Sequence, residues 1–256
     1  MGHNRLGNLP HTHRWKEVIA LLENDAEISE LTDASFYASL TALKRVPSDR
    51  GFLGVLNQIV ELATVSREKD IAGALNQAGF NSEAQASSIG FLSVIATQLT
   101  DKINQTYPRS DVGKIARDAF LEALTKQVLS KTGTLFGGTE NAKTLTVPFR
   151  GDRFKVLMHE FYAGFTSRYL SYYLSRELPH HVGSGKRFSN IDEHSEFNKQ
   201  FDLYCRQTVR IVDEFTPGWI GKAIYKKEAD SKAVGRYAYA AFKKLTEEFQ
   251  RSGPEE

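Results

Sequence analysis

Cysteine is almost absent from this 256-residue chain, which contains only Cys205. A single cysteine can neither close an intramolecular disulfide nor supply the paired thiolates of a structural zinc site. We therefore expect the chain to fold without covalent cross-links in a reducing compartment. Cys205 lies near the apolar side of a predicted helix, which favours a packed thiol over a catalytic nucleophile.

Long apolar runs are absent as well. The longest, Ile89 to Ala96, contains Gly90 and Ser93 and falls far short of the roughly 20 residues that span a bilayer. The opening residues, Met1 to Arg5, do not lead into the apolar stretch of about 7 to 15 residues that is typical of a signal peptide. We therefore expect a soluble, cytoplasmic protein with no membrane span.

Neither sign of charge predominates. The 33 lysines and arginines and the 31 aspartates and glutamates give a formal net charge of +2, too small to indicate a nucleic-acid or membrane partner. Residues 1–130 carry 13 basic and 15 acidic side chains, whereas residues 131–256 carry 20 and 16, so the C-terminal half is mildly basic. Apolar residues make up 41% of the chain, which is enough for an ordinary globular core.

The strongest positive signal is the helical spacing of the apolar residues. They recur at intervals of three and four residues in nearly every segment, which is the pattern of amphipathic helices. The sequence therefore predicts an all-α protein, a multi-helix globular bundle. The apolar stripes of the predicted helices run over residues 15–22, 36–43, 52–60, 89–103, 115–129, 154–173, 197–215 and 234–249.

Helix boundaries are predicted from capping and helix-breaking residues. Ser66, Ser82 and Ser110 are each expected to cap the N-terminus of a helix, because a serine hydroxyl can accept a hydrogen bond from a free backbone N–H there. Gly79 stands where a helix needs a left-handed residue after its last turn. The Thr216-Pro217-Gly218 stretch is expected to break the helix that precedes it and to leave Trp219, Ile220 and Ile224 on a short continuation.

Residues 132–152 interrupt the helical pattern with several glycines and threonines and a proline. We predict two helical parts, residues 1–131 and 153–256, joined by this linker, with a mildly basic surface on the second part. Within the linker, Leu145-Thr146-Val147 alternates apolar and polar residues and is compatible with a short strand or hairpin.

A single long helix is predicted after Asn190, with a buried apolar stripe. The stripe includes Phe197 and Phe201, and its members recur at intervals of three, four and seven residues, which keeps them on one helix face. Arg206 and Arg210 fall on other faces of this helix and are expected to be solvated.

Residues 180–196 are the candidate site of a metal- or phosphate-dependent enzyme. His180, His181 and His194 are the candidate metal ligands, and carboxylates lie near them in the sequence. Their spacing matches no recognised ligand motif, and the His159-Glu160 pair lacks the second histidine of an HExxH zinc helix. The basic glycine-containing loop could instead hold a phosphate, but His180 stands where a P-loop has its first glycine.

Residues 143–187 are a candidate nucleic-acid surface, with eight basic and three acidic side chains. Arg168, Arg176, Lys186 and Arg187 are the candidate phosphate contacts. Interleaved tyrosines could stack bases, namely Tyr169, Tyr172 and Tyr173. The competing interpretation, which we favour, is that these aromatic rings pack in the core while the charges are solvated on the opposite face.

The leading hypothesis is a non-enzymatic helical interaction protein or accessory subunit, which binds a protein partner or self-associates. The 16 phenylalanines and 10 tyrosines provide more large rings than one polar site needs, and such rings anchor protein interfaces. Residues 5–15 and 173–183 resemble segments of a bacterial family of hypothetical proteins. The resemblance covers only these segments and implies a bacterial protein, but no activity and no functional residue.

We predict that the purified protein contains no stoichiometric metal and no bound cofactor, because its histidines lack the spacing of a ligand set. Elemental analysis of the purified chain measures this directly. About one zinc or iron per chain, lost in His181→Ala or His194→Ala, would instead support the metal-dependent enzyme.

Overall fold

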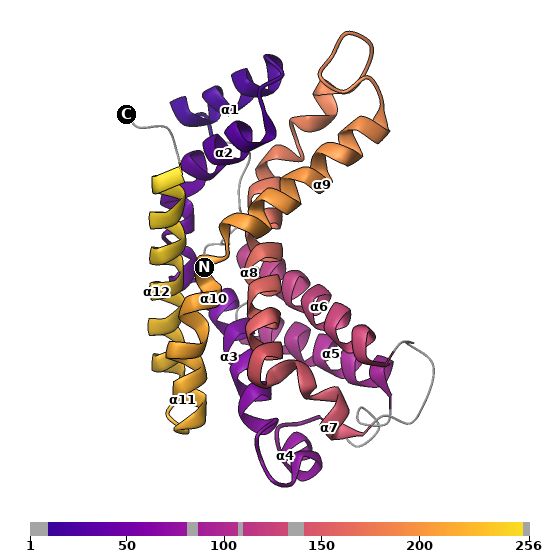
Figure 1. The fold of residues 1–256 in the computed structure, drawn as a ribbon, viewed down its shortest axis with the longest axis vertical. Helices are drawn as coiled ribbons and strands as arrows, with labels where there is room; N and C mark the ends of the chain where they lie inside the picture. The colour runs from indigo at the N-terminus through magenta and orange to yellow at the C-terminus, as the bar shows by residue number, and fades with distance from the viewer. Residues whose placement is uncertain (1–9, 81–86, 107–109, 133–140, 253–256) are drawn as a thin grey trace.

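The computed structural model describes residues 10–80, 87–106, 110–132 and 141–252 of the chain. Helices dominate these ranges, in which the only β-pairing is an isolated bridge between Val182 and Phe188. The prediction of an all-α, multi-helix bundle is confirmed (Figure 1). No helix within these ranges is long and apolar enough to cross a membrane.

Three of the first four helices in the described part of the chain begin at a side-chain cap. In order, the elements are α1 (His13–Glu23), α2 (Ile28–Leu43), the 3-10 turn η1 (Val46–Ser48), α3 (Arg50–Val65) and α4 (Ile71–Gln77). Thr12 caps α1 and Asp49 caps α3, each by accepting a hydrogen bond from a backbone N–H in the first turn. These caps fix where each amphipathic stripe starts.

The predicted N-terminal cap at Ser66 is wrong. Ser66 instead ends α3, where its hydroxyl donates to the carbonyl of Ala63. The cap of α4 is Asp70, whose carboxylate accepts a hydrogen bond from the N–H of Gly73 at 2.9 Å. Gly79 follows α4 with φ +92, as the prediction of a left-handed residue requires.

Two longer helices, α5 (Ser88–Thr106) and α6 (Asp111–Thr132), pack against α3. The predicted cap at Ser110 is confirmed, since its hydroxyl accepts a hydrogen bond from the N–H of Gly113 at 2.8 Å. A Cβ atom on Gly113 would lie 2.7 Å from the Cα of Gly51, so the close crossing of α3 and α6 depends on glycine. The predicted cap at Ser82 lies outside the described residues.

The short strand predicted at residues 145–147 is absent. Leu145 ends the helical turn α7 (Ala142–Leu145), and Val147 begins the 3-10 turn η3 (Val147–Phe149). Thr146 lies between the two turns, and its hydroxyl bonds back to the carbonyl of Ala142 at 2.7 Å. Among the described residues there is no strand with which this segment could pair, and local helical hydrogen bonds satisfy its backbone instead.

Helix α8 (Gly151–Leu174) lies at the centre of the molecule (Figure 1). It packs against α6, α9 and α10, and it also contacts α2. Phe52 of α3 and Phe242 of α12 meet Phe165 of α8, with ring centroids 5.1 and 5.8 Å from it. The buried cluster thus contains residues from both sides of the 132–152 segment. The division of the chain into two folding parts stays a prediction.

The C-terminal half continues through helices that differ from the predicted pattern. In order, they are η4 (Leu178–His181), α9 (Ile191–Thr208), α10 (Ile211–Thr216), the π-helical turn η5 (Pro217–Gly221), α11 (Lys222–Tyr225) and α12 (Ser231–Ser252). Helix α9 starts after Asn190 as predicted, and the Asn190 side chain caps it by accepting a hydrogen bond from the N–H of Glu193. The single helix predicted from residue 191 to 215 is instead divided at Val209 and Arg210.

The break predicted at Thr216-Pro217-Gly218 is a change from α-helix to a π turn, and the predicted short continuation through Ile224 is confirmed as helical. The Thr216 hydroxyl bonds to the carbonyl of Val212 at 2.8 Å and to the hydroxyl of Tyr237 at 2.7 Å. These bonds hold the chain helical as it enters the π turn at Pro217, whose first position tolerates a missing N–H. The chain therefore stays helical as far as Tyr225.

We predict that Phe201→Ala destabilises the protein by about 3 to 5 kcal/mol, because it leaves a cavity in the core. The Phe201 side chain is 1% exposed and its ring stacks on Phe197. Leu203→Ala is the matched control on the same helix, since Leu203 is 55% exposed and its loss should cost about 0.5 kcal/mol or less. Urea denaturation measures both, and equal midpoints for the two variants would contradict the buried stripe.

Candidate functional site

The predicted loop at residues 180–196 borders a hollow beside the end of α1. His180, His181, Lys186 and Arg187 line it from the loop side, and its volume is about 610 Å³. Glu23 and Asp25 at the end of α1 and Glu177, which precedes η4, add carboxylates to its lining. Two of the three candidate histidines are thus brought to one hollow, together with side chains of both charges.

His194 does not line this hollow. Its ring lies against Phe188, with centroids 5.3 Å apart, and its Nε2 atom is 3.2 Å from the Asn198 side chain. Within the described ranges, no group of three or more histidine, cysteine, aspartate or glutamate side chains is arranged to hold a metal ion. The structure therefore does not unite His180, His181 and His194 into one ligand set.

Arg187 performs a structural role in this loop. Its guanidinium donates to the backbone carbonyls of Leu21 and Ala26, which stand at and beyond the C-terminal end of α1. The same group lies 5.4 Å from the centre of the Phe197 ring. Burial lowers the pKa of Arg187, and the carboxylates of Asp25 and Glu27 oppose this effect. Arg187 thereby ties the loop to α1 rather than facing a ligand.

The remaining basic residues of the nucleic-acid hypothesis are also engaged within the chain. Lys186 donates to the carbonyl of His180 at 2.7 Å, and Arg176 lies 5.2 Å from the centre of the Tyr172 ring. Arg168 bonds to the carboxylate of Glu122 and to the carbonyl of Gly164. Of the tyrosines proposed to stack bases, Tyr169 and Tyr173 are buried. These contacts favour the interpretation in which the rings pack and the charges bond within the chain, and the nucleic-acid surface stays a hypothesis.

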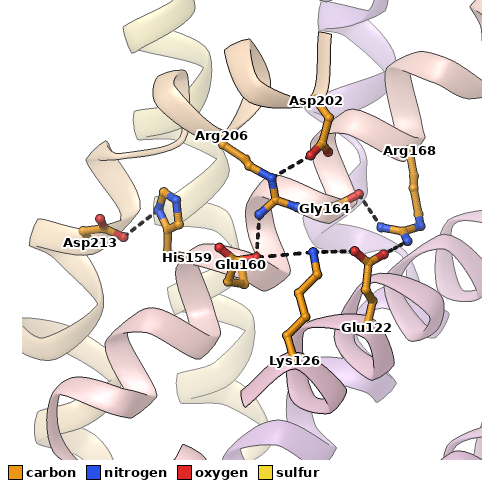
Figure 2. Close-up of polar contacts among 9 residues, drawn as sticks. All are labelled: Glu122, Lys126, His159, Glu160, Gly164, Arg168, Asp202, Arg206 and Asp213. Carbon is orange, nitrogen blue, oxygen red and sulfur yellow. Dashed lines mark hydrogen bonds and ion pairs between the residues drawn. The ribbon is translucent and has the colours of Figure 1, made fainter. Parts of the chain in front are cut away.

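Arg168 belongs to a network of charged side chains that joins α6, α8 and α9 (Figure 2). Arg206 of α9 donates to Asp202 at 2.6 Å and also bonds to Glu160 of α8. Lys126 of α6 lies 3.9 Å from Glu160 and 2.6 Å from Glu122. The expectation that Arg206 is solvated is wrong, because its position on α9 faces the carboxylate of Glu160. Arg210 is exposed, as predicted.

The network shifts the ionisation of its members. Burial raises the pKa of Glu122, but hydrogen bonds and attraction from Lys126 and Arg168 outweigh burial and lower that pKa to about 2. Burial lowers the pKa of Arg206, but Asp202 and Glu160 outweigh burial and raise it. Both groups are therefore held in their charged forms, which suits ion pairing between helices and not proton transfer.

A histidine–aspartate pair lies next to this network. The Nδ1 atom of His159 on α8 is 3.0 Å from a carboxylate oxygen of Asp213 on α10 (Figure 2). Cys205 is fully buried, and burial raises the pKa of its thiol. A buried neutral thiol is inert, which agrees with the sequence-based interpretation of Cys205 as a packed residue.

A second hollow, which the sequence analysis missed, surrounds the π-helical turn η5. Its volume is about 510 Å³, and its apolar wall includes Phe215 and Trp219, whose ring centroids lie 4.9 Å apart. Lys222, Lys226 and Arg236 line it with basic groups. Glu214 and Glu228 complete its charged lining.

The hollow is assembled from α10, η5, α11 and the first turns of α12, which lie together along one flank of the molecule (Figure 1). Trp219 and Arg236 come together only because the chain turns back between α11 and α12. A π turn would have pointed to this site, since such turns are frequent at functional sites. The sequence did not reveal the turn, because Pro217-Gly218 is typical of a helix end.

No protein-family model, curated protein or solved structure matches this chain.

We predict that Glu122→Gln lowers stability at neutral pH and flattens its dependence on acid. The folded-state pKa of Glu122 is about 2, below the roughly 4.3 of an unfolded glutamate. Its ionised form thus stabilises the fold above the unfolded pKa, and this contribution is lost as pH falls toward about 2. Melting temperatures measured between about pH 7 and pH 2 test this linkage.

The matched control is Glu30→Gln, which neutralises an exposed glutamate on α2. It should leave the acid dependence of the melting temperature close to that of the wild type. Parallel curves for wild type and Glu122→Gln would contradict a stabilising role for the ion pairs of Glu122.

Proposed function

We propose that this chain is a non-enzymatic binding protein that engages a protein partner through the surface around the π turn. We call this the π-turn surface and define it by Phe215, Trp219, Lys222, Lys226 and Arg236. The observation that carries the proposal is the exposure of Trp219 at the edge of a hollow, with basic side chains on either side of it.

The exposed aromatic residues are concentrated in one part of the chain. Among the described residues, the aromatic side chains in the exposed class are Trp219, Tyr225 and Tyr239. The other tryptophan, Trp15, is buried in the core and is 1% exposed, compared with 36% for Trp219. Tryptophan, tyrosine and arginine are the residues most enriched among interface hot spots.

A third, smaller hollow lies farther along α12 on the same flank. Its volume is about 380 Å³, and Tyr239 and Lys243 of α12 line it together with Lys44, which follows α2. Arg236 and Tyr239 are three residues apart on α12 and therefore neighbours on its surface. A partner that contacts Trp219 and Arg236 can therefore also contact Tyr239, so the proposed interface includes both hollows.

Charged residues elsewhere in the described chain bond to other parts of the protein, which favours a binding function over a catalytic one. The network around Glu160 and Arg206 uses its charges to join helices, and its pKa shifts favour fixed ionisation. The loop that holds His180 and His181 is fastened by Lys186 and Arg187 to backbone carbonyls. These arrangements leave the π-turn surface as the best supported place for a functional contact.

The experiment that tests the proposal is site-specific photo-crosslinking in the native cell. A photoreactive residue at position 222, on the π-turn surface, should crosslink to a defined partner protein that mass spectrometry identifies. The control position is Lys199, an exposed residue of α9. Equal crosslinking of the same protein from both positions would contradict a contact specific to the π-turn surface.

We then predict that Trp219→Ala weakens binding to the purified partner by about 30-fold, corresponding to about 2 kcal/mol for the loss of a central aromatic anchor. Leu203→Ala removes another exposed apolar side chain and should leave the affinity unchanged. Titration calorimetry measures the affinities, and thermal melting verifies that both variants are folded. Unchanged affinity in folded Trp219→Ala would reject the proposal.

A further inference from the structure

The chemistry of the partner can be inferred from the charges around Trp219. Residues 222–244 contain seven basic and two acidic side chains, and all nine are exposed. Of the two carboxylates, Asp230 is used to cap α12, where it accepts a hydrogen bond from the N–H of Ala233 at 2.7 Å. The uncompensated charge of this flank is therefore positive.

Among the described residues, four of these seven basic groups have no ion pair or ring contact, whereas the Nζ atom of Lys244 lies 5.8 Å from the centre of the Phe215 ring. Lys227 pairs with Glu68 at 2.9 Å, and Lys243 lies 3.9 Å from Glu247. Lys222, Lys226 and Arg236 have no ion pair within 4.0 Å among the described residues, although they line the same hollow. This contrasts with Arg168 and Arg206, which bond to carboxylates across helix interfaces.

The apolar wall of the hollow suits a single apolar side chain. Phe215 and Trp219 meet at 67° with centroids 4.9 Å apart, and Ala223 and Ala233 line the hollow beside them. Apolar contact and positive potential thus occur side by side.

From this juxtaposition we infer that the partner presents an acidic segment with one large apolar or aromatic anchor. The anchor packs against Phe215 and Trp219, and flanking carboxylates pair with Lys222, Lys226 and Arg236. The inference rests on the proposed function, which it deepens by naming the kind of partner.

Single-stranded nucleic acid fits the same surface less well. Nucleic-acid grooves stack successive bases on several exposed rings, whereas in this hollow Phe215 is half-buried and Trp219 is the one lining ring in the exposed class. Glu214 and Glu228 line the hollow and would repel a phosphate backbone. A protein segment can place a backbone N–H or a basic side chain beside each of these two carboxylates.

The test selects peptides without assuming their sequence. A phage-displayed library of random peptides is panned on the full-length protein, with prior depletion on a Lys222→Glu/Arg236→Glu double variant. We expect the enriched peptides to carry aspartate or glutamate on both sides of a phenylalanine, leucine or tryptophan. Enrichment of basic or neutral peptides, or no enrichment that the double variant removes, would overturn the inference.

An enriched peptide, synthesised with phenylalanine in place of any tryptophan, is then titrated while tryptophan emission is recorded. Trp219 reports on the hollow and buried Trp15 serves as an internal reference, so the change in emission should vanish in Trp219→Phe. The double variant, followed by anisotropy of a labelled peptide, should bind at least about tenfold more weakly. Lys199→Glu, a charge reversal on α9, should bind as the wild type does.

An oligo(dT) strand titrated under the same conditions serves as the competing ligand. Tighter binding of oligo(dT) than of the best peptide would overturn the acidic-segment inference in favour of nucleic acid. The failure of the inference is distinguishable from that of the proposed function. A crosslinked partner whose contact segment is not acidic overturns only the inference, whereas a partner insensitive to Trp219→Ala overturns the proposed function itself.

Discussion

The middle of α8 is buried on every side, and the packing of the surrounding helices depends on this constraint. Every residue from Phe161 to Ser167 is buried, so this stretch requires a neighbour in each direction. The helices α6, α9 and α10 provide these neighbours, together with aromatic side chains of α3 and α12. Charge cannot be placed there without a large desolvation cost. Glu160 and Arg168 flank the stretch, and each bonds to an oppositely charged residue on another helix.

Local signals explain how much of the fold could be predicted. Helical periodicity and the caps at Ser110 and Asn190 depend on residues three or four apart, which the sequence shows directly. The errors at Ser66 and at residues 145–147 arose where more than one local structure suits the same residues. Pro217 was misjudged for a related reason, because the Thr216–Tyr237 contact that supports the π turn joins two separate helices.

The candidate site was less predictable, because the role of a charged residue is decided by contacts that are remote in sequence. In the sequence Arg187 is one basic residue of a glycine-containing loop, but in the structure it bonds to Leu21, 166 positions away. Arg206 has the spacing of a solvated helix face and nevertheless meets Glu160 of α8. The hollow around Trp219 likewise exists only after α12 packs beside η5.

The exposure of Trp219 can be traced to the packing around α8. Because α10 packs against α8 and α12, Val212 and Thr216 are held in the core at the entrance to the π turn. The wider turn then places Ile220 in the core and leaves its neighbour Trp219 at the surface. Trp219 is 36% exposed, so its packing on Phe215 stabilises the monomer, but the hydrophobic free energy of the exposed part of the side chain is not gained on folding. A partner that covers the ring recovers that hydrophobic free energy on binding, which is why the proposed interface is centred on Trp219.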